Sequence, residues 1–236
     1  MTCNMLDKLT KNKNQMNRIL KILTFSLLIV FNCSAQNSKP SDFIPEEYVA
    51  FEQFFGDLNN DGLKDCVMII KKTDTANIVM NRFDKKVDRN RRGIIILFKK
   101  NKGYQLADKN YNCFSSENED GGVYYPPELW IEIKNNKLYV KYLHGRYGYW
   151  TYTFRFQNSN FELIGFDSSS DHGPITDEKI SINFLTKKKL VSENTNENTE
   201  ESGDEIFKET WSNIEIENLI KLSEIKDFDE LDMYNY

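Results

Sequence analysis

The sequence is poor in proline, glycine and histidine, and it carries no excess of positive charge. Among 236 residues there are five prolines and eleven glycines, which excludes collagen-like and proline-rich low-complexity chains. The formal net charge of −5 argues against a nucleic-acid partner, because binding to a phosphate backbone needs a cationic face. The two histidines are not placed at a spacing typical of zinc ligands.

The composition is that of a globular protein. Hydrophobic residues make up 39% of the chain, aromatic residues 13% and charged residues 28%. This is too much apolar material for a wholly disordered chain and too little for a polytopic membrane protein. Beyond the N-terminal region we expect no transmembrane helix, because no apolar run is long enough to cross a bilayer.

The N-terminal region has the three parts of a secretory signal peptide. Arg18 and Lys21 precede an apolar run from Ile22 to Phe31, and small residues follow at Cys33 to Ala35. A positive segment, a short apolar run and a small-residue cleavage site are typical of export. We therefore assign residues 1–35 to an N-terminal extension plus signal peptide, and expect a periplasmic or extracellular protein.

Two cleavage sites compete in this region. A cut after Ala35 would leave a soluble protein that begins at Gln36. A cut before Cys33 would instead produce an outer-membrane lipoprotein anchored through the sulfur of Cys33. The residues before Cys33 match the lipoprotein pattern poorly, which favours the soluble form.

Two cysteines remain after cleavage, Cys66 and Cys113. In an oxidising compartment they could form a disulfide. They could equally be two buried free thiols, because sequence alone does not show whether the two side chains meet.

Residues 36–44 are polar with a proline, and we expect a flexible leader there. The chain then predicts a β domain over residues 45–190. Candidate strands occur at Tyr48 to Phe54, Cys66 to Ile70 and Gly93 to Phe98. The last two are continuous apolar runs, which favours burial on both faces of the strand.

Residues 129–167 show period-two alternation of apolar and polar residues over four short runs separated by turns. Trp150, Tyr152, Phe154 and Phe156, for example, alternate with polar residues. This pattern predicts an antiparallel β-meander with short hairpins, arranged like a sandwich so that the aromatic face is covered.

The C-terminal quarter is less regular. Ile180 to Leu190 predicts one further strand, and residues 192–205 are rich in glutamate and asparagine, as in a solvated or disordered loop. We expect residues 191–236 to form this acidic loop and a strand and tail that dock on the β domain.

The residues from Asp57 to Asp65 form the clearest chemical motif. Side-chain oxygens occur at loop positions one, three, five and nine, with Gly62 at position six. Calcium binds six to eight oxygens, and this spacing can fold them round one point. The predicted ligands are Asp57, Asn59, Asp61, the backbone carbonyl of Leu63, and Asp65. The alternative is a metal-free turn, because Asn, Asp and Gly favour turns anyway.

Position twelve of this motif is Met68 instead of glutamate, and an apolar β-like segment follows the loop, so it is not an EF-hand. The motif resembles the Asp-x-Asn-x-Asp-Gly-x-x-Asp loop of FG-GAP β-repeats, here present once. Together with the strand from Arg92 to Phe98 and the aromatic hairpin from Tyr147 to Phe156, the chain resembles small secreted bacterial proteins of unknown function. That resemblance implies a shared fold and secretion, and no activity.

Two other segments could contribute to binding. The acidic stretch from Glu117 to Asp120 could hold a second cation or form a solvated loop. A turn rich in aromatic residues could contact a glycan or a protein; its candidate residues are His144, Arg146, Tyr147 and Tyr149.

The sequence thus favours an exported, calcium-stabilised β-module that binds or scaffolds an unidentified protein or glycan. We identify no catalytic residue. The alternative is an extracytoplasmic hydrolase that uses paired carboxylates, which would require a pocket with two facing acids, one of raised pKa.

Overall fold

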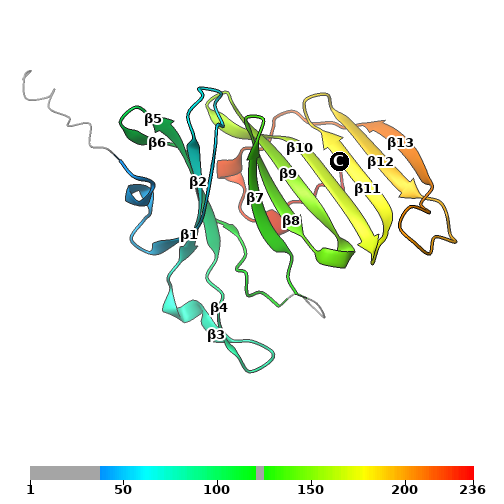
Figure 1. Cartoon of the computed structure of the whole chain (residues 1–236), viewed down its shortest axis with the longest axis horizontal. Helices are drawn as coiled ribbons and strands as arrows, with labels where there is room; N and C mark the ends of the chain where they lie inside the picture. Colours follow the sequence, from blue (N-terminus) through cyan, green and yellow to red (C-terminus); the bar gives the residue numbers. More distant parts are fainter. Residues whose placement is uncertain (1–37, 121–124) are drawn as a thin grey trace, which may run out of the picture. The chain divides into compact units, whose positions relative to one another are not determined.

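The computed structural model describes residues 38–120 and 125–236, which form one compact unit from Ser38 onward (Figure 1). The predicted mainly β, antiparallel fold is confirmed: strands dominate, and the described residues contain 3₁₀ turns but no α-helix. None of their helical segments is long and apolar enough to span a membrane. The predicted signal peptide, with Cys33, lies outside the described residues.

The strands form two sheets and a separate hairpin. The four-stranded sheet has the order β1-β2-β5-β6, the seven-stranded sheet the order β13-β12-β11-β10-β9-β8-β7, and β3 pairs with β4. Their bounds are β1 Tyr48–Gly56, β2 Asp65–Lys72, β3 Ile78–Met80, β4 Lys86–Asp88, β5 Arg92–Lys100, β6 Gly103–Phe114, β7 Glu128–Lys134, β8 Lys137–Leu143, β9 Gly148–Gln157, β10 Asn160–His172, β11 Ile175–Asn183, β12 Lys188–Asn194 and β13 Phe207–Asn213.

Both central strands of the four-stranded sheet, β2 and β5, are buried along nearly their whole length. Alternate residues of each strand point to opposite faces, and each face has its own apolar cluster. Val67 and Ile69 face the main core, whereas Met68 and Ile70 face a smaller cluster. This confirms the burial on both faces that the continuous apolar runs predict.

The smaller cluster explains why the predicted flexible leader is wrong for residues 38–44. Pro40–Phe43 form the 3₁₀ turn η1, and Phe43 and Ile44 pack against the outer face of the sheet. The hydroxyl of Ser38 accepts a hydrogen bond from the backbone N–H of Tyr104 at 2.9 Å. Covering the apolar face of β2 and β5 fixes this segment in place.

The seven-stranded sheet contains the predicted meander. Strands β7 to β10 follow one another as antiparallel hairpins, and the turn between β7 and β8 has positive φ at Asn135 and Asn136. Tyr152 and Phe154 on β9 are fully buried, while Trp150 and Phe156 are partly buried against the same core. The four aromatic residues therefore share the inner face of the sheet.

Two predictions for the C-terminal region are corrected. Ile180 to Leu190 is not one strand: β11 ends at Asn183 and β12 begins at Lys188, with Lys187 at φ +57° in the turn. The predicted domain boundary at residues 190 and 191 falls inside β12, so both parts belong to one sheet. The acidic segment closes the β12–β13 hairpin, where Thr195 N–H donates to the Ile206 carbonyl.

The tail after β13 docks on the core through the 3₁₀ turns η4 (Leu222–Glu224) and η5 (Phe228–Glu230). Leu222, Ile225, Phe228 and Met233 are buried in the main cluster, which also contains residues of both sheets. Figure 1 shows this tail in red between the four-stranded and the seven-stranded sheets. Sheet faces and tail thus share one apolar core.

Cys66 and Cys113 are both buried free thiols. Cys66 belongs to the smaller cluster and Cys113 to the main core, on the other face of the four-stranded sheet. The sequence left open whether these cysteines form a disulfide or stay as free thiols, and in the structure they are free thiols. Burial raises the pKa of the Cys66 thiol to about 11, so it stays protonated at neutral pH.

Candidate functional site

The oxygen-rich loop joins β1 to β2, whose paired ends are Gly56 and Asp65. The carboxylate of Asp57 accepts backbone N–H bonds from Asn60 at 2.7 Å and from Gly62 at 2.9 Å. Asp61 accepts the N–H of Leu63 at 2.9 Å. Gly62 has φ +81°, a conformation that glycine adopts without strain. These bonds curl the chain round the side-chain oxygens of the loop.

Asp65 anchors this loop to the core and is fully buried. One carboxylate oxygen accepts the N–H of Leu58 at 2.8 Å, and the other accepts the N–H of Lys99 on β5 at 2.8 Å. Burial raises the pKa of Asp65, while the two N–H bonds oppose that rise. Asp65 therefore links the loop to a neighbouring strand whether or not a metal is bound.

The donor set fits a hard cation by its chemistry, because Asp57, Asn59 and Asp61 supply side-chain oxygens in one short loop. However, no group of three or more His, Cys, Asp or Glu residues within 38–120 and 125–236 is arranged to hold a metal ion. Lys100 Nζ lies 3.9 Å from Asp61 and offsets part of the negative charge. The calcium site therefore stays a prediction.

The residues of the predicted aromatic turn lie at the β8–β9 connection but do not form one surface. Gly145–Tyr147 is the 3₁₀ turn η3. The ring of His144 lies 5.2 Å from that of Tyr147 and 6.4 Å from that of Trp150, centroid to centroid. The Arg146 guanidinium lies over the Tyr147 ring. Tyr149 precedes Trp150 on β9 and is exposed on the outer face of the sheet.

The acidic stretch from Glu117 to Asp120 pairs with cations of the protein itself. Glu117 binds the buried ammonium of Lys71, and Asp120 forms an ion pair with Arg89 at 2.5 Å. Glu119 accepts a hydrogen bond from the Ser116 hydroxyl at 2.7 Å. Each of these three residues therefore has a partner within the protein, although Oε2 of Glu117 is buried without a hydrogen bond among the described residues.

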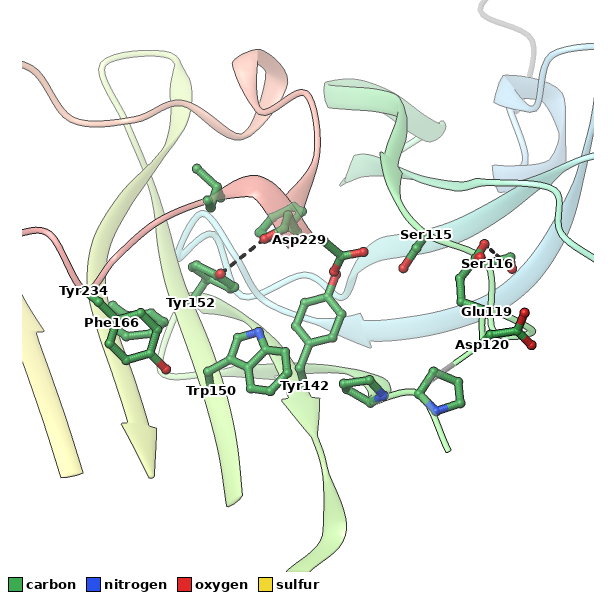
Figure 2. A pocket seen from close by; sticks show the side chains of 14 residues that line it. Ser115, Ser116, Glu119, Asp120, Tyr142, Trp150, Tyr152, Phe166, Asp229 and Tyr234 are labelled. Atoms are coloured by element: carbon green, nitrogen blue, oxygen red, sulfur yellow. Dashed lines mark hydrogen bonds between the residues drawn. The ribbon is translucent and has the colours of Figure 1, made fainter. Parts of the chain in front are cut away.

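A pocket of about 400 Å³ opens where β8, β9 and β10 meet the tail and the segments flanking residues 121–124 (Figure 2). This volume lies within the usual range for small-molecule sites. Six of the lining residues are aromatic: Tyr142, Trp150, Tyr152, Phe166, Phe228 and Tyr234. The others are Ser115, Ser116, Glu119, Asp120, Pro126, Pro127, Asp229 and Leu231.

The aromatic rings pack closely on one another. Tyr142 and Trp150 are stacked, with ring centroids 5.3 Å apart and an interplanar angle of 14°. Tyr152 contacts Phe228 edge-on at 5.0 Å, and its hydroxyl lies 3.4 Å from the Phe228 carbonyl, to which it donates. The tail therefore supplies part of the pocket and fixes the strand residues opposite it.

The hydroxyl of Tyr142 has no hydrogen-bond partner among the described residues, although it is buried. The residue as a whole is 3% exposed, and in Figure 2 its hydroxyl is directed towards Asp229. Burial, and then the nearby Asp229 carboxylate, raise the pKa of Tyr142 well above its ordinary value. The hydroxyl thus keeps its proton, and an unpartnered buried hydroxyl costs about 1–3 kcal/mol.

Apart from its tyrosines, the pocket has three ionisable lining residues, and all three are acidic: Glu119, Asp120 and Asp229. The first two have the partners described above. The Asp229 carboxylate is exposed and makes no hydrogen bond or ion pair with another described residue. One unpaired negative charge therefore stands at the pocket, next to the Tyr142 hydroxyl.

Sequence reasoning missed this pocket. It placed Trp150 and Tyr152 correctly on the core face of one strand, but gave no role to Tyr142 or Asp229. A weak signal was present, because Asp229 directly follows the last strongly apolar aromatic residue of the tail, Phe228. No pattern in the sequence of the tail indicated that it would contact β8 and β9.

No protein-family model matches the chain, and neither a curated protein nor a solved structure is significantly similar to it.

We predict that Tyr142→Phe leaves the stability of the protein unchanged or raises it by up to about 1–3 kcal/mol, because it removes an unsatisfied buried hydroxyl. The matched variant Tyr152→Phe should lower stability by about 0.5–1.5 kcal/mol, because that hydroxyl donates to Phe228. Urea unfolding of both variants measures the difference. A loss above 1 kcal/mol in Tyr142→Phe would show that its hydroxyl is bonded in the native protein.

Proposed function

We propose that this protein is an exported, calcium-stabilised β-module that binds a ligand without transforming it. The observation that carries the binding role is the aromatic pocket with the unpartnered hydroxyl of Tyr142. Buried polar groups in native proteins normally have partners. A group that lacks one inside a pocket is a candidate contact for a ligand.

The carboxyl groups favour binding over the alternative, a hydrolase with paired acids. Such an enzyme needs two facing carboxyl groups, one of them with a raised pKa. Among the described residues, the carboxyl groups of raised pKa are Asp65 and Asp108, and neither lines the pocket. Asp120, which does line it, is paired with Arg89.

Export and calcium enter this proposal from the sequence. The signal-peptide pattern of residues 16–35 supports export. The oxygen-rich loop supports calcium, because a cation would offset the repulsion among Asp57, Asp61 and Asp65. The loop reaches two regions of the core: Asp65 accepts the N–H of Lys99 on β5, and the Asn136 amide donates to the Asp57 carbonyl. Ordering this loop would stabilise both regions.

The binding role predicts that some small molecules perturb the pocket selectively. We expect a fragment library of mixed charge to contain compounds that shift the indole N–H resonance of Trp150 saturably. Trp130 and Trp211 are about half or more exposed and lie outside the pocket, so their indole resonances are internal controls. A library that leaves Trp150 unmoved, or moves all three alike, would contradict a ligand site at this pocket.

The calcium site predicts a metal-dependent melting temperature. At a tenfold excess over Kd, binding to the native state alone adds about 1.4 kcal/mol, which corresponds to an increase of about 3–6 °C for a domain of this size. Asp61→Ala should lose most of this increase. Glu209→Ala, which removes an exposed carboxylate from β13, should keep it.

Thermal melting with millimolar Ca²⁺ and with chelator measures these differences. Equal melting temperatures of the native protein in both conditions would refute the site. An increase that survives in Asp61→Ala would place the ion elsewhere.

A further inference from the structure

We infer that the aromatic pocket binds an organic ammonium ion, with Asp229 and Tyr142 as its polar contacts. The inference rests on the proposed binding role and adds the chemical class of the ligand. It does not depend on calcium, because no residue of the loop from Asp57 to Asp65 lines the pocket.

The charge of the pocket is the first observation that points to a cation. Its acidic residues have no lysine, arginine or histidine beside them in the lining. Arg89 neutralises Asp120 from outside the lining, and Glu119 is bonded to a neutral hydroxyl. The carboxylate of Asp229 makes no ion pair with another described residue, so an opposite charge on a ligand would bind there favourably.

The aromatic wall is the second observation. Ring faces carry negative electrostatic potential, so a desolvated cation is attracted to the rings of tyrosine and tryptophan. Trp150 is only partly buried, and Tyr234, which also lines the pocket, is exposed. Figure 2 shows Trp150 next to Tyr142, with Tyr234 beside Phe166. A cation near Asp229 would lie among these rings.

The Tyr142 hydroxyl selects among cations. Its oxygen has no partner within the described chain, and it can accept a hydrogen bond from an N–H group. A primary ammonium carries three such donors, enough to contact both Tyr142 and Asp229. A quaternary ammonium has none and would gain only the charge and ring contacts. The predicted ligand is therefore a primary alkylammonium group.

Buried cations near the pocket do not cancel this preference. Arg92 is not part of the pocket lining; it donates to the Ser115 carbonyl at 2.9 Å and interacts electrostatically with Tyr142. Glu117 lies 3.9 Å from the same guanidinium and also binds Lys71, which is paired with Asp88 as well. Within this group two carboxylates offset the two cations, so Arg92 attracts Asp229 electrostatically without forming an ion pair with it.

The test is titration of the purified protein with n-butylammonium and with 1-butanol, its neutral counterpart of similar shape, while the Trp150 indole N–H resonance is followed by NMR. We expect n-butylammonium to bind at least about tenfold more tightly. Asp229→Asn should weaken n-butylammonium binding about tenfold, whereas Glu230→Gln, the same change one residue further on and outside the pocket lining, should change it less than about twofold.

Tyr142→Phe should weaken n-butylammonium binding several-fold and leave tetramethylammonium binding within about twofold, because only the primary ion has N–H donors. Equal loss for both ions would overturn the role of the hydroxyl. Saturable binding of 1-butanol or of methyl glucoside, with no preference for n-butylammonium, would overturn the ammonium class while leaving the pocket as a ligand site. If the fragment library perturbs Trp150 but no ammonium ion does, the class is likewise wrong.

Discussion

The packing of Phe228 among aromatic rings of both sheets is the contact on which the rest of the structure depends. Its ring stacks on Phe114 at the end of β6, with centroids 4.9 Å apart, and meets Tyr152 on β9 at 5.0 Å. Each such pair adds about 0.5–1.5 kcal/mol beyond area burial. One side chain near the C-terminus thus joins the four-stranded sheet, the seven-stranded sheet and the tail, and its neighbour Asp229 reaches the pocket.

Hydrogen bonds hold the tail in the position that this ring contact requires. The Asn110 side chain on β6 donates to the carbonyls of Leu222 and Ile225 at 2.9 and 2.7 Å. The N–H of Leu163 on β10 donates to the Ile220 carbonyl at 2.8 Å. Because the tail has no strand partner along most of its length, these bonds set its register against the two sheets. The pocket therefore follows from how the tail docks.

The sequence predicts local elements well and their meeting points poorly. Alternation from Leu129 to Phe166 was enough to predict the meander, because period two is a property of the strand itself. The turn at Lys187 was missed because it contains neither glycine nor proline. The ordered structure of residues 38–44 was not predicted, because Phe43 and Ile44 are buried only by contact with β2 and β5, which lie further along the sequence.

The pocket depends even more on distant contacts. Ser115, Trp150 and Asp229 come from segments that share no motif, and only the docked tail brings them together. The oxygen-rich loop is the opposite case: its hydrogen bonds are local, and Asp57 and Asp61 lie together in one short turn, as their spacing predicts. Only the hydrogen bond between Asp65 and Lys99 could not be predicted from the local sequence, because it is the fold that brings β5 beside the loop.

The central claim is that Phe228 connects the tail to the four-stranded sheet, and a double-mutant cycle tests it most directly. Phe114→Leu, Phe228→Leu and the double variant are unfolded in urea, and the coupling energy is taken from the four free energies of unfolding. The account predicts a favourable coupling of about 0.5–1.5 kcal/mol. Additivity within about 0.3 kcal/mol would show that the two rings do not interact, and would contradict the docking of the tail on which the pocket depends.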